Sequence, residues 1–138
     1  MIKTLPIKVW EEYRSLIAKT RDLYYLVLPA NLAYCGKLNY VSAYVPDEWF
    51  FERLREWLTN RGEDSVYYFL TETTGDENTD FEITIDELTT EALLGLSRSE
   101  NAIVSKNFEW AIFIDHEGDI HVAGIASLFS ALNNRTDK

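Results

Sequence analysis

The chain has 138 residues, one cysteine, a formal net charge of −10 and a hydrophobic fraction of 46%. This composition supports a core without metals or disulfides, so we expect one globular domain over residues 1–138. The acidic balance disfavours binding to the phosphate backbone of nucleic acids, and a single cysteine excludes an internal disulfide. The sequence has no run of about 20 apolar residues and no leader-like N-terminus, so we expect a cytoplasmic protein without a membrane span.

The first half of the chain predicts two helices and a strand. Apolar residues at helical spacing indicate an amphipathic helix over Thr4–Lys19. The short aromatic run Leu23–Leu28 is typical of a strand. A second helix is predicted to begin after Asp47, a good N-cap residue, and to end near Gly62, which suits the left-handed conformation of a helix C-terminus.

A second aromatic strand is predicted over Val66–Thr71, and it contains the adjacent pair Tyr67 and Tyr68. Because neighbouring strand residues point to opposite faces, one tyrosine must lie on each side of the sheet. Neither face would then be polar. The pattern therefore predicts helices on both faces, or one aromatic face reserved for a partner.

The C-terminal third predicts a meander. Strands over Phe108–Asp115 and Asp119–Gly124 flank a turn in which Gly118 can adopt the left-handed conformation. This turn sets a register that pairs Ile114 with Ile120, Ile112 with Val122 and Phe113 with His121. An earlier strand over Ala102–Ser105 completes the meander, and Ile125–Leu132 forms a closing helix. Together these elements predict an α+β domain with a mixed or mainly antiparallel sheet, a C-terminal meander and packed helices.

Catalytic signatures are absent from the sequence. It contains no nucleophile elbow and no glycine-rich phosphate loop, and Cys35 has no histidine near it in the sequence. The hairpin tip carries ligand-type side chains, namely Asp115, His116, Glu117 and Asp119, but alternation along the strands would scatter them. We therefore expect no enzymatic activity and no cofactor. A small-molecule-binding or enzymatic domain that uses His116 or His121 stays an alternative.

One segment concentrates negative charge without any basic residue. Between Glu72 and Glu91 the acidic residues are Glu72, Asp76, Glu77, Asp80, Glu82, Asp86, Glu87 and Glu91. A block of like charge stays solvated, collects a cation or meets a basic partner.

The cation hypothesis rests on twelve residues, 76–87, which resemble an EF-hand calcium loop. The candidate ligands are Asp76, Asn78, Asp80, Glu82 and Glu87. Phe81 stands where such a loop needs glycine, and the preceding segment is predicted to be a strand rather than a helix. The alternating run Phe81, Ile83 and Ile85 predicts an ordinary strand over the same residues.

The partner hypothesis rests on the acidic segment and the aromatic strand. A small, acidic, cysteine-poor α+β chain rich in aromatic residues resembles, in general type, the immunity proteins with which bacteria neutralise nuclease and other toxins. The resemblance implies a basic protein partner such as a toxin domain, which an acidic face attracts and aromatic anchors hold. The candidate contact residues are Tyr67, Tyr68, Asp76, Glu77, Asp80, Glu82, Asp86, Glu87 and Glu91.

Overall fold

The computed structural model describes residues 2–18, 28–71, 80–96 and 100–135. Its elements in chain order are β1 (Lys3–Thr4), α1 (Ile7–Ala18), β2 (Tyr34–Val41), α2 (Glu48–Arg61), β3 (Ser65–Phe69), β4 (Asp80–Thr84), the 3₁₀-helix η2 (Ile85–Glu87), α3 (Thr90–Leu94), β5 (Asn101–Val104), β6 (Ala111–Ile114), β7 (Asp119–Ala123) and α4 (Ala126–Asn133).

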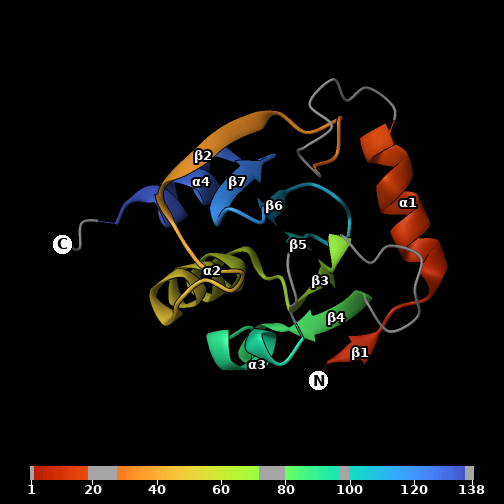
Figure 1. Cartoon of the computed structure of the whole chain (residues 1–138), viewed down its shortest axis with the longest axis horizontal. Coiled ribbons are helices and arrows are strands. Elements are labelled where there is room, and N and C mark those ends of the chain that lie inside the picture. Colours follow the sequence, from red (N-terminus) through yellow and green to blue (C-terminus); the bar gives the residue numbers. More distant parts are fainter. Residues whose placement is uncertain (1, 19–27, 72–79, 97–99, 136–138) are drawn as a thin grey trace.

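The described strands form one seven-stranded sheet in the order β1-β4-β3-β5-β6-β7-β2 (Figure 1). Neighbouring strands pair antiparallel throughout this part of the chain. The predicted α+β domain with a mainly antiparallel sheet is therefore confirmed. The pairing of β2 with β7 is irregular, with register shifts between Tyr34 and Gly36 and between Lys37 and Val41.

The meander β5-β6-β7 has the predicted register. Ile114 lies opposite Ile120, and Phe113 lies opposite His121. At the turn, the Gly118 N–H donates to the Asp115 carbonyl over 3.0 Å, and Gly118 has φ 85°. A side chain at Gly118 would also collide with the Ser42 carbonyl oxygen, so both the turn and the neighbouring loop require glycine.

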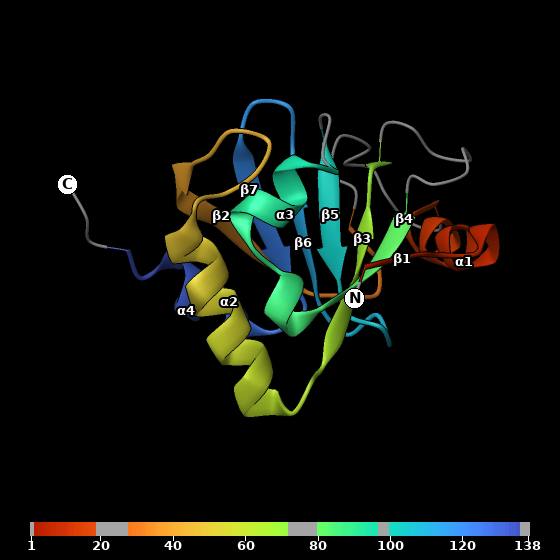
Figure 2. The same ribbon diagram turned by 90° about the horizontal axis from the view of Figure 1, so that it is seen from below.

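Helices cover both faces of the sheet, as one of the two sequence-based alternatives predicted (Figure 2). The larger core lies under α2 and α4 and includes Phe50, Leu54 and Trp110. On the opposite face, α1 packs Trp10 and Tyr13 against a smaller cluster that contains Phe69 and Phe113. Complete burial in that cluster raises the pKa of the Tyr13 phenol.

Helix α2 has the predicted caps. The Asp47 carboxylate accepts the N–H of Phe50 at the N-terminus, and Gly62 adopts φ 78° at the C-terminus. Arg135 forms a bidentate pair with Asp47, and this contact holds the pKa of the Asp47 carboxyl below its usual value. These contacts fix the start of α2 relative to the C-terminal segment.

Other predicted boundaries differ. Helix α1 begins at Ile7 rather than Thr4, because Lys3 and Thr4 pair with β4 as a short edge strand. After β4 the chain forms η2 and then the short α3, whose N-cap is Thr89. The predicted strand Leu23–Leu28 lies outside the described residues except for its last residue.

Candidate functional site

The acidic segment is divided between the interior and the surface. Asp80 at the start of β4 is 6% exposed, and burial raises the pKa of its carboxyl group to about 6. Its Oδ1 atom has no hydrogen-bond partner among the residues that the structure describes. This burial contradicts the prediction that Asp80 contacts a partner: its side chain lies on the same face of β4 as Glu82, but the packing of the chain covers it.

Glu82 lies in β4 and is already paired. Its Oε2 atom is 3.0 Å from the Lys106 ammonium and accepts a 2.8 Å hydrogen bond from the Ser65 hydroxyl. Lys3 lies 3.8 Å from its other oxygen. The Lys106 and Ser65 hydrogen bonds hold the pKa of Glu82 below its usual value. Its negative charge is thus offset within the chain.

The remaining predicted acidic residues lie beyond β4. Asp86 is exposed in η2, and a hydrogen bond from the Thr84 hydroxyl lowers the pKa of its carboxyl group. Glu87 accepts a 3.2 Å hydrogen bond from Thr84, and Glu91 is exposed in the first turn of α3. Asp76 and Glu77 lie outside the described residues.

The two tyrosines of β3 separate as alternation requires. Tyr68 is completely buried in the core under α2, so the prediction that it anchors a partner is wrong. Tyr67 points to the other face, is partly buried, and packs against Phe69 and Phe108. It is covered by its own neighbours rather than presented as a free aromatic surface.

The described part of the EF-hand-like segment is extended. Residues 80–84 form β4, as the strand interpretation predicted, and Glu87 follows in a 3₁₀-helix. Asp80 and Glu82 thus lie along a strand rather than around a common point, and Asn78 is outside the described residues. No cluster of three or more His, Cys, Asp or Glu side chains suited to a metal occurs in the described part of the chain. Calcium binding itself stays a prediction.

A groove between α2 and η2 brings other acidic residues together. It has a volume of about 700 Å³ and is lined by Arg55, Glu56, Thr59, Asn60, Gly62, Glu63, Asp64, Ile85 and Asp86. Four of these residues carry carboxylates, and one carries a guanidinium. We call this the acidic groove.

The positive charge of the acidic groove is already engaged. Arg55 donates a 2.7 Å hydrogen bond to the Leu88 carbonyl and lies 3.8 Å from Glu48. Glu63 is paired with Arg61 over 2.8 Å. Glu56 lies 3.8 Å from the Arg53 guanidinium, and Asp64 and Asp86 are further exposed carboxylates on the groove wall. The groove therefore favours a positively charged ligand.

A row of acidic residues extends the groove along α2. Glu48, Glu52 and Glu56 are all exposed and follow one another at intervals of four residues, which places them on one side of the helix. The spacing of four was visible in the sequence. The sequence did not reveal that this row lies near Asp86, because that depends on how α2 packs against η2.

The other side of α2 is aromatic. Trp49 and Trp57 are partly buried and flank Arg53, whose guanidinium lies over the Trp49 ring at 5.7 Å. A pocket of about 380 Å³ is lined by Trp49, Arg53, Glu56, Trp57, Asn60, Ala131 and Asn134. Glu56 lines both this aromatic pocket and the acidic groove.

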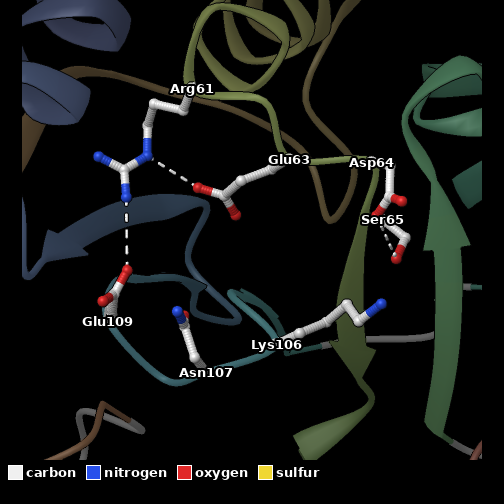
Figure 3. Close-up of a pocket in the computed structure, with 7 residues that line it drawn as sticks. All are labelled: Arg61, Glu63, Asp64, Ser65, Lys106, Asn107 and Glu109. Atoms are coloured by element: carbon white, nitrogen blue, oxygen red, sulfur yellow. Dashed lines mark hydrogen bonds and ion pairs between the residues drawn. The ribbon is translucent and has the colours of Figure 1, made fainter.

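A third pocket lies where α2 runs into β3 (Figure 3). Its wall alternates in charge: Arg61 bridges Glu63 and Glu109, while Lys106 points across toward Asp64 and Ser65. Two cationic side chains offset most of the charge of three carboxylates here, so this pocket favours positive charge less than the acidic groove does.

The two histidines differ in surroundings. His116 is exposed, and its hydrogen bond to Glu100 over 2.7 Å raises the pKa of the imidazole. His121 is 7% exposed and contacts Asp115 and Tyr34. Sequence patterns identified the histidines but not the contacts of His116 with Glu100 and of His121 with Tyr34, whose partners lie further away along the chain.

No protein-family model matches this chain, and neither a curated protein nor a solved structure resembles it significantly. Among the described residues, every helix is too short or too polar to cross a membrane.

Proposed function

We propose that this chain is a small protein-binding domain that neutralises a basic protein partner in the manner of an immunity or inhibitor protein. The observation that carries the proposal is the acidic groove, where four carboxylates surround one arginine that is already engaged. The net charge of −10 points in the same direction. We place the protein and its partner in the cytoplasm.

The proposed binding mode combines attraction and anchoring. The row of Glu48, Glu52 and Glu56 attracts a basic surface over distances of about the Debye length and speeds its encounter. Arginine or lysine side chains of the partner then enter the acidic groove. Trp49 and Trp57 replace Tyr67 and Tyr68 as the proposed anchors, because partly buried tryptophans beside arginine have the composition of interface hot spots.

The proposed mechanism of neutralisation is occlusion. A nuclease or similar toxin binds its substrate phosphates through a basic cleft. A carboxylate-lined surface that occupies this cleft displaces the substrate without any chemistry. The inhibitor then needs only fast association and slow release.

The proposal is tested by capture with two matched charge-reversal variants. The tagged wild type, the groove variant Glu56→Lys/Asp86→Lys and the control Glu11→Lys/Glu12→Lys are exposed to lysate of the source organism. The control residues are exposed on α1, across the sheet from α2, and both variants change the net charge equally. Bound proteins are eluted with rising salt and identified by mass spectrometry.

We expect a stoichiometric basic protein to bind the wild type and the control and to elute with salt. The groove variant should lose it, with association slowed about tenfold or more. Equal loss from both variants would show that only net charge matters, and retention by the groove variant would exclude the acidic groove.

A further inference from the structure

A chain of three polar side chains lies at the β2 edge of the sheet, away from the acidic groove. The His121 Nε2 atom is 3.2 Å from Asp115 Oδ2, and the His121 Nδ1 atom is 3.1 Å from the Tyr34 hydroxyl oxygen. His121 is 7% exposed and its ring stacks on Phe113, while Tyr34 is 47% exposed. The chain thus links a half-buried carboxylate to a phenol at the surface.

Asp115 is held in place by the turn. Its Oδ1 atom accepts the backbone N–H groups of Glu117 and Asp119 over 2.9 and 3.0 Å. This leaves Oδ2 directed at the imidazole. A carboxylate that is anchored in this way orients the histidine beside it.

The order of hydrogen bonds determines where the protons lie. The Asp115 carboxylate only accepts, so the His121 Nε2 atom must carry a proton. In the neutral imidazole, Nδ1 then has the lone pair and accepts the Tyr34 O–H proton. A base beside a hydroxyl, oriented by a third group, is the arrangement that activates a nucleophile.

Lys37 adds a positive charge next to this arrangement. It lies opposite His121 in the register of β2 and β7, so both side chains leave the same face of the sheet. The Lys37 side chain is 53% exposed, and its ammonium group lies 3.8 Å from the Asp119 carboxylate. An anionic group arriving at Tyr34 would thus meet a sheet face that also carries this cation.

We propose that Tyr34 is an activated nucleophile that accepts a phosphoryl group from an electrophilic phosphoryl donor. The phenol oxygen attacks phosphorus, the bond from phosphorus to the leaving group breaks, and the leaving group departs with that electron pair. The phenol proton passes to His121 Nδ1, and Asp115 stabilises the imidazolium. Tyr34 is thus a modification site, and Asp115 is a positioning residue.

The chain offers a matched internal control. Tyr44 is 46% exposed, as Tyr34 is 47%, but no contact to a histidine is found for it in the described structure. The intact protein is treated with a biotinylated fluorophosphonate at pH 7.5, and the labelling rate of each tyrosine is followed by peptide mass spectrometry. Fluoride is the leaving group. We expect Tyr34 to react on the order of 100-fold faster than Tyr44.

Two variants separate activation from simple accessibility. His121→Gln removes the base and should lower the Tyr34 rate to that of Tyr44. Asp115→Asn still accepts hydrogen bonds from the turn, but its amide donates to Nε2 and so favours the tautomer with a proton on Nδ1. That tautomer cannot take the phenol proton, and the Tyr34 rate should fall similarly while the Tyr44 rate stays unchanged.

Each outcome is decisive. Equal rates for Tyr34 and Tyr44 in the wild type would overturn the proposal, as would undiminished Tyr34 labelling in a folded His121→Gln variant. If that variant fails to unfold cooperatively on heating, Asp115→Asn decides the question alone, since an unchanged ratio of the two rates would exclude His121 as the base. Rescue of His121→Ala by added imidazole would support the proposal further.

Discussion

Asp80 and Asp86 lie six residues apart in one acidic segment, yet their surroundings shift the pKa values of their carboxyl groups in opposite directions. Burial raises the pKa of Asp80 to about 6, whereas the Thr84 hydroxyl lowers the pKa of Asp86 at the surface. Asp80 begins β4 and its side chain is buried there, whereas Asp86 lies beyond the end of this strand, exposed in η2. Charges that are clustered in sequence are therefore divided in space, and only the outer part can meet a partner.

The largest effect on stability is expected from replacing Ile83, an apolar residue between Asp80 and Asp86. Ile83 is completely buried, so Ile83→Ala should lower the free energy of unfolding by about 3 kcal/mol. Asp86→Ala should change it far less, because the side chain is exposed. Urea unfolding of both variants measures this difference. Similar losses would mean that η2 belongs to the cooperative core.

The buried carboxylate should be a cost to stability at neutral pH. A raised pKa means that the folded state binds the proton more tightly than the unfolded chain, so unfolding becomes harder as the pH falls through about 6. Asp80→Asn should stabilise the protein at pH 7 by about 2 kcal/mol. The wild type should gain about 1 kcal/mol between pH 7 and pH 5 through this residue alone.

Asp80→Asn is the control for the predicted pH dependence, because it lacks the carboxyl group that binds the proton. Urea unfolding at both pH values should show the pH-dependent gain in the wild type and a smaller gain in Asp80→Asn. If the two proteins respond to pH identically, then Asp80 is not the group whose protonation is linked to folding.

The contribution of Glu82 to stability should have the opposite pH dependence to that of Asp80. The pKa of Glu82 is lowered by the Lys106 and Ser65 hydrogen bonds, so its contribution is present at neutral pH and disappears as the pH falls below the unfolded value of about 4.3. Glu82→Gln should cost about 1 kcal/mol at pH 7. A double-mutant cycle with Lys106→Ala measures the pair, and a coupling energy near zero would show that Lys106 contributes nothing.

Calcium should have the smallest effect. Asp80 and Glu82 are spaced along the extended strand β4 rather than arranged around a common point, and Lys106 already pairs with Glu82. We therefore expect calcium at 1 mM, a concentration on the order of weak protein sites, to shift the melting temperature no more than magnesium does. A larger shift with calcium would indicate that residues outside the described part complete a site.

Features that depend on neighbouring residues were predictable from the sequence. Asp47 and Gly62 predicted the limits of α2, because each cap is a contact between residues close in the chain. The turn at Gly118 predicted the register of β6 and β7, since turn geometry determines pairing over the adjacent residues.

Features that depend on distant packing were not predictable. Alternation showed that Tyr67 and Tyr68 face opposite ways, but not that both faces are covered where they lie. The acidic groove needs α2 beside η2, and the contact of His121 with Tyr34 needs β2 beside β7. The two-residue strand β1 is too short to produce any periodic signal.

The two edges of the sheet bear on the behaviour of the protein at high concentration. β1 offers two residues for pairing, and β2 is interrupted by register shifts around Gly36, whose φ is 144°. Within the described sheet, neither edge presents a long, regular row of free N–H and C=O groups on which another chain could add a strand. The irregularity of β2 is thus a protection against fibrillar association, and a variant that straightened this strand should precipitate sooner.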